Sequence, residues 1–438
     1  MFHILNFLRQ EVSVYSYRSA KSVPNVLVPF SLNMYVSVCA IEKKSVPLQA
    51  VKRMVLLLAV MLMSVVTRAE QPKTVGMEYF DSVEVSLLTC APHEEVYSLY
   101  GHTALRWHDL HTKQDFVFNW GIFNFQKPHF VVRFVFGLTD YELGVTDYKP
   151  FAAYYRHWGS MVSEQVLNLT GAEKARLQGL LAENLRPENR IYRYNYFFDN
   201  CSTRPRDMVE RCLDGTVQYE ERQDFEPSFR QMIREKTGHH EWATEGNDLL
   251  LGVRADMKTT REEQEFLPEN LMFDFDHAQI HGNDGSWRPL VKARRMTVEP
   301  GVQVRVPDFV LSPVAVGIVL LTVSLLVFAV EWRRGRTYIL WDAALMTLTG
   351  LAGCVLFVML FSQHPATTSN LQVLLINPVH LFFIPSVVRR RRTYYWKVLL
   401  VMALLLLVGS IFQRYAMLTP FLALCLLTRF WIHKRSEK

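Results

Sequence analysis

Residues 192–204 read YRYNYFFDNCSTR, and this stretch holds the cysteine on which the interpretation of the whole chain depends. The aromatic run Tyr192–Asp199 is typical of an extended segment. It breaks at Asn200, and a helical pattern of apolar residues follows Cys201. The apolar residues of that pattern are Met208, Val209, Cys212 and Leu213. Cys201 is therefore predicted near the N-terminus of a helix, where unpaired N–H groups and the helix dipole stabilise a thiolate.

Two interpretations of Cys201 remain open at this point. Free cysteines are among the residue types most often buried, so Cys201 could be a small structural side chain. Its neighbours argue against an apolar environment, because they are polar or charged: Asp199, Asn200, Ser202, Thr203 and Arg204. The pattern favours a nucleophile, which requires a base within hydrogen-bonding reach.

A predicted β-hairpin supplies a candidate base for this cysteine. Residues 102–108 and 115–120 are strand-like and flank a polar turn, and a further strand is predicted over residues 82–89. If the hairpin is symmetric about its turn, Ala104 faces Asn119 on the neighbouring strand. Because side chains alternate between the two faces, His102 and Asn119 then share one face. His102 is predicted as the base, and Asn119 as the residue that orients its imidazole.

The segments between the hairpin and the cysteine are predicted to be mostly helical. A short helix is expected over residues 151–159 and an extended run over 162–169. Thr170 and Glu173 have the spacing of a capping box, which predicts a helix from Thr170 to about Leu185. The chain order is therefore hairpin with His102, then helices, then Cys201.

The chain has 438 residues, of which 50% are hydrophobic, and a net charge of +6. The apolar residues concentrate after Val310, whereas residues 70–307 have ordinary globular composition. Much of the positive charge lies beside apolar segments, where it indicates membrane topology, so no nucleic-acid partner is predicted.

Six cysteines occur in the chain: Cys39, Cys90, Cys201, Cys212, Cys354 and Cys425. They form neither a CxxC motif nor a cluster with histidine at zinc spacing, so no metal site and no cofactor are predicted. Cys90 and Cys212 could pair in an oxidising compartment and leave Cys201 as a free thiol, but the sequence leaves this pairing open.

The N-terminal region contains an export signal in an unusual position. Lys52 and Arg53 precede the apolar run Met54–Val66, which is the order of a signal peptide, predicted over residues 51–69. Residues 1–50 are predicted to be a spurious or disordered leader, with translation starting near Met54. The alternative is a genuine N-terminal segment with an uncleaved anchor.

Residues 308–438 are predicted to form an all-α bundle of five transmembrane helices. The apolar segments lie at about 309–330, 338–361, 371–388, 397–412 and 415–432. Basic residues follow the first, third and fifth segments, at Arg333–Arg336, Arg389–Arg392 and His433–Arg435. Basic loops stay in the cytoplasm, so the C-terminus is predicted there and residues 70–307 are predicted in the periplasm of an inner-membrane protein.

Two polar positions lie at the outer side of the predicted bundle. His364 belongs to an uncharged loop, and Asn377 precedes Pro378 inside the third segment. Polar groups at membrane depth are costly, so both residues are predicted to contact a lipid substrate. A solvated loop histidine and a satisfied amide at a kink are the alternatives.

Several stretches together resemble the Lnb-type lipoprotein N-acyltransferases, whose periplasmic domain was long described only as a domain of unknown function. The stretches are Gly101–Arg106, Val117–Gly121, Glu164–Thr170, Asp199–Asp207, Glu265–Pro268, His364–Pro365 and Asn377–Pro378. The resemblance covers roughly residues 75–435 and excludes residues 1–50. The order of His102 before Cys201 also resembles circularly permuted papain-like folds of the lecithin:retinol acyltransferase group.

The resemblance implies an α+β, permuted papain-like domain followed by the membrane bundle. It implies that Cys201 takes an acyl chain from a phospholipid as a thioester and passes it to the N-terminal amine of a diacylated lipoprotein. Arg204 and Arg206 are predicted to meet the phosphate of the substrate. A membrane-tethered cysteine peptidase or amidase, and a non-catalytic membrane scaffold, remain the alternatives.

Overall fold

The computed structural model describes residues 77–123, 128–222, 226–307, 309–391 and 394–436. The predicted leader and signal peptide lie outside the described residues. The chain divides into two compact units, residues 1–81 and 82–438. Of the first unit the structure describes helix α3 (Met77–Asp81). All other described helices and strands lie in the second unit.

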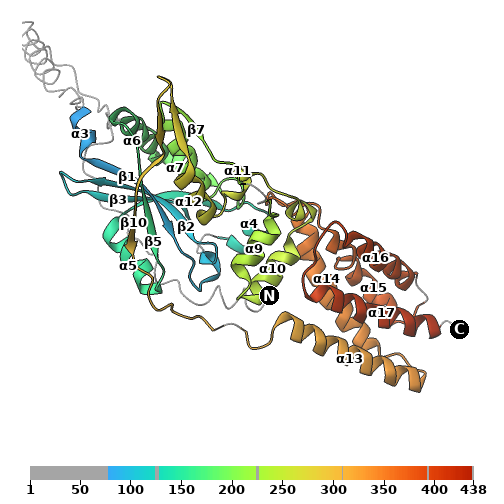
Figure 1. Cartoon of the computed structure of the whole chain (residues 1–438). Coiled ribbons are helices and arrows are strands. Elements are labelled where there is room, and N and C mark those ends of the chain that lie inside the picture. Colours follow the sequence, from blue (N-terminus) through green and yellow to red (C-terminus); the bar gives the residue numbers. More distant parts are fainter. Residues whose placement is uncertain (1–76, 124–127, 223–225, 308, 392–393, 437–438) are drawn as a thin grey trace, which may run out of the picture. The chain divides into compact units, whose positions relative to one another are not determined.

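A seven-stranded sheet forms the centre of the periplasmic part, with strand order β10-β5-β1-β2-β3-β4-β6 (Figure 1). Every pair of neighbours in it is antiparallel. The strands are β1 (Val83–Cys90), β2 (His102–Asp109), β3 (Asp115–Ile122), β4 (Asp140–Asp147), β5 (Val162–Leu167), β6 (Ile191–Arg193) and β10 (Val291–Val298). The three N-terminal strands match the predicted ones to within two residues at each end.

The register of the predicted hairpin is as expected. Leu105 of β2 pairs with Phe118 of β3, and His108 pairs with Asp115 across the turn. Continuing this register by one residue places Ala104 opposite Asn119. His102 and Asn119 therefore emerge on the same face of the sheet, as the alternation of side chains requires.

Helices cover both faces of the sheet. Helix α5 (Tyr148–Trp158) packs on the face that carries Ala104 and Val117, where its Phe151 and Tyr155 enter the core. Helices α6 (Gly171–Leu185) and α12 (Pro268–His277) lie against the other face, as Figure 1 shows. On that face Trp120 donates to Asn184 of α6 at 2.9 Å. The predicted capping box is present, since the Thr170 hydroxyl and the Glu173 carboxylate each bond to the other residue's backbone N–H.

Shorter elements complete the periplasmic part. They are η1 (Val96–Ser98), α4 (Phe130–Val135), α7 (Pro187–Arg190), α8 (Thr203–Cys212), β7 (Gly215–Gln218), α9 (Phe229–Thr237), α10 (Glu241–Leu250), η2 (Val253–Asp256), α11 (Arg261–Gln264), β8 (Gln279–Gly282) and β9 (Trp287–Pro289). Strands β7, β8 and β9 form a second, three-stranded sheet.

The C-terminal part is helical and apolar. Its helices are α13 (Pro313–Arg334), α14 (Ile339–Met359), η3 (Leu371–Leu374), α15 (Val379–Val388), α16 (Tyr395–Gly409) and α17 (Leu418–Ser436). In the described part of the chain, three segments are long and apolar enough to cross a membrane: Pro313–Arg334, Ile339–Met359 and Leu371–Val388. Helix α16 is shorter, and α17 carries charged residues, so the predicted count of five spans stays a prediction.

A charged cluster holds three of these helices together. Arg429 of α17 is fully buried and donates to Glu331 of α13 and to Asp342 of α14. His433 lies 3.0 Å from the second oxygen of Asp342. Charges buried in an apolar bundle are tolerated when they are paired and hydrogen-bonded, so this cluster fixes the mutual position of the helices.

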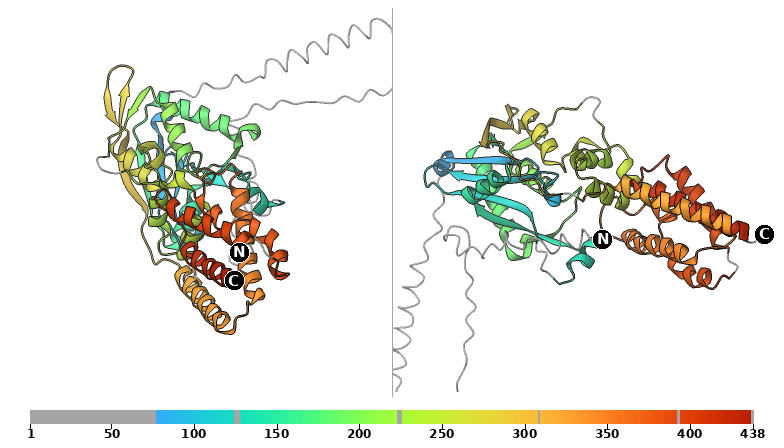
Figure 2. Two further views of the ribbon diagram at one scale, coloured as in Figure 1. Left: turned by 90° about the vertical axis from the view of Figure 1, so that its right-hand side faces the viewer. Right: turned by 90° about the horizontal axis from the view of Figure 1, so that it is seen from below.

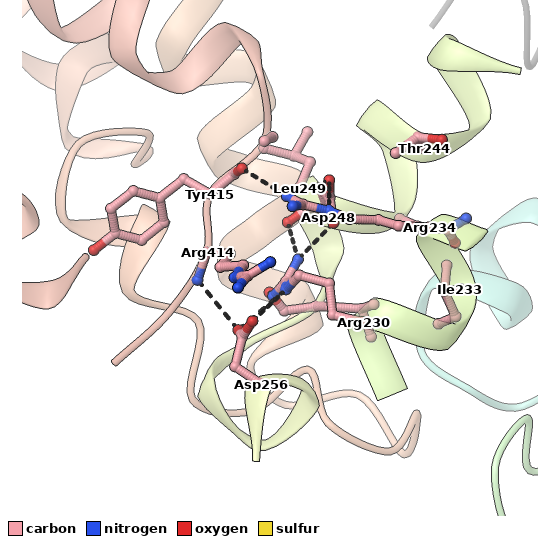
Figure 3. A network of polar contacts seen from close by, with 12 residues as sticks. Arg230, Ile233, Arg234, Thr244, Asp248, Leu249, Asp256, Arg414 and Tyr415 are labelled. Carbon is pink, nitrogen blue, oxygen red and sulfur yellow. Dashed lines mark hydrogen bonds and ion pairs between the residues drawn. The ribbon is translucent and has the colours of Figure 1, made fainter. Parts of the chain in front are cut away.

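In Figure 2 the helical part, orange to red, lies next to the yellow-green segment that contains α9 and α10. A second polar network joins the two parts there (Figure 3). Arg230 of α9, 1% exposed, is the centre of this junction. Its guanidinium donates to Asp248 of α10 at 2.9 Å and to Asp256 of η2 at 3.0 Å. The two carboxylates tie Arg230 to its neighbours on both sides.

Residues from the membrane loops bind this network directly. The Gln372 side chain of η3 donates to the carbonyl of Asp248 at 2.9 Å and accepts from Thr419 of α17 at 2.6 Å. The backbone N–H of Arg414 donates to Asp256 at 3.3 Å. Glu245 of α10 accepts from the N–H of Met417 at 2.6 Å. The periplasmic and helical parts are therefore docked against each other rather than joined only by the chain.

Candidate active site

Cys201 lies in a tight connection between β6 and α8. The extended conformation ends at Arg193, earlier than predicted, because Asn195 and Asp199 exchange two backbone hydrogen bonds of 3.0 and 2.9 Å and close a turn. Helix α8 then begins at Thr203, two residues after Cys201, with Ser202 as its N-cap. The cysteine thus stands at a helix start, as the sequence predicted.

Asn200 fixes the backbone around the cysteine. Its side-chain oxygen accepts from the N–H groups of Ser202 and Thr203, at 2.8 and 3.0 Å. Its side-chain nitrogen donates to the carbonyl of Phe266 at 2.9 Å. Asn200 is only 3% exposed, so these bonds satisfy a buried amide and hold the turn in one conformation.

The three residues predicted to form the site are brought together. The His102 Nε2 lies 3.2 Å from the Asn119 Oδ1, and the imidazole is also hydrogen-bonded to the Cys201 thiol. Because Asn119 occupies Nε2, Nδ1 is the ring nitrogen available to the sulfur. His102 and Cys201 are each half-buried, whereas Asn119 is buried.

The electrostatics of this cluster favour an ion pair. Burial alone would raise the pKa of the Cys201 thiol, but the His102 imidazolium, the Thr103 N–H and the Ser202 hydroxyl outweigh burial and lower it. Burial opposes protonation of His102, yet the adjacent thiolate raises the pKa of the imidazole above its ordinary value. Each partner therefore favours the charged form of the other, and the thiolate is the nucleophilic form of a cysteine.

Neighbouring residues that the sequence interpretation missed hold the pair in place. The Thr103 and Ser202 hydroxyls lie 3.0 Å apart and join β2 to the start of α8. Gly121, with a φ of +95°, faces the cysteine: a Cβ there would lie 3.7 Å from the Cys201 Cβ and 3.9 Å from the Tyr194 ring. The Val117–Gly121 motif contained this glycine, but only the structure shows that it borders the thiol.

The two arginines after Cys201 are already paired. Arg204 forms an ion pair with Asp199 at 2.5 Å and lies over the Tyr192 ring at 3.4 Å. Arg206 is buried and donates to Glu265 at 2.9 Å, with Asp207 as a second partner. These ion pairs position both side chains, and the predicted contact of Arg204 and Arg206 with a substrate phosphate stays a prediction.

The predicted membrane-side residues lie in different settings. His364 is half-buried, and its Nε2 lies 2.5 Å from the carbonyl oxygen of Phe134 in α4, while burial lowers the pKa of its imidazole. Asn377 satisfies its amide locally, donating to the Leu374 carbonyl at 3.2 Å and accepting from the Val379 N–H at 3.1 Å. Asn377 therefore caps the break between η3 and α15.

The remaining thiols of the periplasmic part are unpaired. Cys90 and Cys212 are both free and buried, so the pairing that the sequence left open does not occur. Burial raises the pKa of Cys212 to about 12 and that of Cys90 further, which keeps both thiols protonated. Among the described residues, no group of three or more His, Cys, Asp or Glu side chains could hold a metal ion.

Comparison with known families bears on these observations. The model of the Lnb N-terminal periplasmic domain matches residues 78–235, and the model of the Lnb transmembrane domain matches residues 305–437. The chain belongs to the Lnb family. No curated protein and no solved structure matches it.

Membership of the Lnb family defines the chain as an inner-membrane protein with a periplasmic domain. The first match contains His102, Asn119 and Cys201, and the second contains His364 and Asn377. The family models assign no role to these residues, so their roles are argued from the geometry.

Proposed function

We propose that this Lnb-family protein transfers an acyl chain from a phospholipid to the N-terminal amine of a diacylated lipoprotein, through a thioester on Cys201. The observation that carries the proposal is a half-buried cysteine, Cys201, just before α8 and next to the imidazole of His102, which lowers the pKa of the thiol, in a domain docked on the helical part. A thiolate attacks esters readily, and an amine attacks the resulting thioester readily.

In the first step, the Cys201 sulfur attacks the carbonyl carbon of a phospholipid ester. The C–O bond to the glycerol breaks, and the alkoxide leaves as an alcohol by taking the proton of the His102 imidazolium. Asn119 supports this step because its contact with Nε2 orients the ring and leaves Nδ1 available for the proton transfer. The products are a lysophospholipid, a thioester on Cys201 and a neutral His102.

In the second step, the α-amine of the lipoprotein attacks the thioester. Neutral His102 takes a proton from the amine, the C–S bond breaks, and an amide forms. Cys201 returns to a thiolate and His102 to an imidazolium, so the ion pair of the resting protein is restored. The protein is unchanged after one complete cycle.

The finer architecture belongs to the same proposal. The order of His102 on a strand before Cys201 at a helix start fits a permuted papain-like site. Five membrane spans with a cytoplasmic C-terminus would place the site on the periplasmic side, where both lipid substrates lie. A reporter that is active only in the periplasm should be inactive when fused at Lys438, and an active reporter there would contradict this topology.

The decisive experiment is mass spectrometry of a lipoprotein N-terminus from cells with and without the protein. We expect a third acyl chain only when wild-type protein is present, and none with Cys201→Ala. Cys354→Ser, which changes a thiol in α14, is the matched control and should retain the modification. A cleaved peptide in place of an added acyl chain would favour the peptidase alternative.

A further inference from the structure

Helix α4 presents an exposed apolar surface on the segment that follows β3. The exposed fractions of its neighbouring side chains are 42% for Val131, 56% for Val132, 43% for Phe134 and 39% for Phe136. Arg133, the charged residue of this helix, is paired with Asp140 at 2.5 Å. The segment connects β3, which carries Asn119, to β4.

The same segment rests on the end of the membrane bundle. The N–H of Gln363 donates to the Phe136 carbonyl at 3.0 Å, and His364 contacts both the carbonyl and the ring of Phe134. The loop that contains these residues follows α14, one of the segments long and apolar enough to span a membrane. At this end of α14, Phe357 is 46% exposed and Phe361 is 70% exposed. The apolar surface of α4 therefore continues the lipid-facing surface of α14.

A row of aromatic rings leads from α4 to the cysteine. The ring centroids of Phe134 and Phe130 are 6.3 Å apart, and those of Phe130 and Phe123 are 6.2 Å apart. Tyr141 follows at 5.0 Å from Phe123, and Tyr194 stacks on Tyr141 at 4.1 Å.

The row ends at the site. Tyr194 and Cys201 both border Gly121, since a Cβ there would lie 3.9 Å from the Tyr194 ring and 3.7 Å from the Cys201 Cβ. The four rings from Phe123 to Tyr194 are half-buried: Phe123, Phe130, Tyr141 and Tyr194. Part of each residue packs against its neighbours, and part remains accessible. A row of partly exposed aromatic rings is an apolar path for a flexible hydrocarbon chain, and it needs no charged group along its length.

We propose that α4 inserts its apolar face among the acyl chains of the outer leaflet, and that the row from Phe134 to Tyr194 guides one acyl chain to Cys201. The occupant of this face is phospholipid, because the surface is continuous with that of a membrane-spanning segment. The insertion of α4 is independent of catalysis, whereas the guiding role rests on the proposed acyl transfer.

Photo-crosslinking tests the insertion. The full-length chain, with p-benzoylphenylalanine in place of Val132, is incorporated into phosphatidylethanolamine and phosphatidylglycerol vesicles that carry labelled acyl chains. Position 110 is the matched control, since Leu110 is 41% exposed but lies in the polar turn after β2, at the opposite end of that strand from His102. We expect a lipid adduct at position 132 and none at 110. An adduct with a protein, or none at 132, overturns the proposal.

A second arm tests the path to the thiol. Val132→Asp and Val131→Asp should each lower acylation of Cys201 by vesicle phospholipid about tenfold relative to Leu110→Asp. The rate of Cys201 alkylation by iodoacetamide reports whether the site remains assembled. Acylation equal to that of Leu110→Asp, or loss of alkylation in both variants, overturns the guiding role. If wild-type Cys201 is never acylated, the proposed function fails, and crosslinking still decides the insertion.

Discussion

The surroundings of Cys201 and the junction around Arg230 are both built from polar groups removed from water, but they differ in how accessible the central side chain remains. The Arg230 guanidinium is satisfied by the carboxylates of Asp248 and Asp256 and by three backbone carbonyls, and the side chain is 1% exposed. The Cys201 sulfur is stabilised as a thiolate by His102 and remains half-buried. A fully satisfied charge gives rigidity, whereas a stabilised but accessible charge gives reactivity.

The comparison also shows how the two regions depend on each other. A thiolate at the membrane can react with a lipid ester only if its height above the bilayer is fixed, because positioning carries much of the barrier to such a reaction. Under the proposed function, the junction sets that height, because α9, α10 and η2 contact the loops of the helical part directly. Variants near Cys201 should therefore lose acyl transfer, whereas variants near Arg230 should lose stability.

The largest expected effect is that of Cys201→Ser. We expect acyl transfer to fall by roughly a thousandfold or more, because one imidazole cannot activate a hydroxyl as it does a thiol. The amount of protein in the membrane should remain at the wild-type level, since the substitution is nearly isosteric. Acyl transfer to a lipoprotein is measured by mass spectrometry. Activity near the wild-type level would show that Cys201 is a structural residue.

His102→Ala should cost about as much as the loss of the nucleophile, because the two residues act as one unit. Asn119→Ala should cost less, about tenfold to a hundredfold, because an orienting residue transfers no proton. Initial rates of acyl transfer for the two variants, at equal amounts of protein, measure the difference. An Asn119→Ala defect as severe as that of His102→Ala would contradict the assigned roles.

At the junction, Arg230→Met should destabilise the folded protein by about 3–5 kcal/mol, since it leaves the carboxylate of Asp248 buried without its main partner. Thermal unfolding in detergent measures this loss. Arg234→Met is the matched control. Arg234 is a second partner of Asp248, but its own side chain is 31% exposed, so its removal should reduce the free energy of unfolding by less. Equal effects of the two variants would show that burial of Arg230 is not what makes the junction rigid.

The pH dependence of Cys201 alkylation tests the pairing of the Cys201 thiol with His102. An ordinary thiol has a pKa of about 8.5, so its reactivity falls below that pH. The lowered pKa of Cys201 keeps the thiolate present on acidification, and reactivity is lost only as the pH falls through that lowered value. In His102→Ala burial is opposed only by the Thr103 N–H and the Ser202 hydroxyl, so the pKa should rise and the profile should move to higher pH, with about a tenfold lower rate at neutral pH. An unchanged profile would exclude the ion pair.

The smallest effects are expected at the membrane loops. His364→Ala removes the contact with Phe134 and should lower acyl transfer about two- to fivefold, at normal protein levels. Asn377→Leu removes a local cap worth about 1 kcal/mol and should have a similar or smaller effect. Both rates are compared with the wild type in membranes. A loss as large as that of Asn119→Ala would mean that these residues contact the substrate.

Local patterns predicted much of the site. The alternation of the hairpin from His102 to Asn119, the capping box at Thr170 and the helix after Cys201 all appear as expected, because each depends on residues close in sequence. The aromatic run before Cys201 was less well predicted. Asn195 and Asp199 close it into a turn, and neither aromatic content nor alternation indicates such a bond.

Periodicity, composition and parity were enough to predict a sheet domain, an apolar helical part and the meeting of Cys201, His102 and Asn119. Which charges are satisfied could not be predicted in this way. Arg206 donates to Glu265, which is 59 residues away in the sequence, and Gln372 donates to the carbonyl of Asp248, which is 124 residues away. The lowered pKa of Cys201 is decided in the same way, because burial and a distant imidazole act on the thiol together. Partners so far apart in the chain leave no local pattern, and the fold alone brings them within hydrogen-bonding distance.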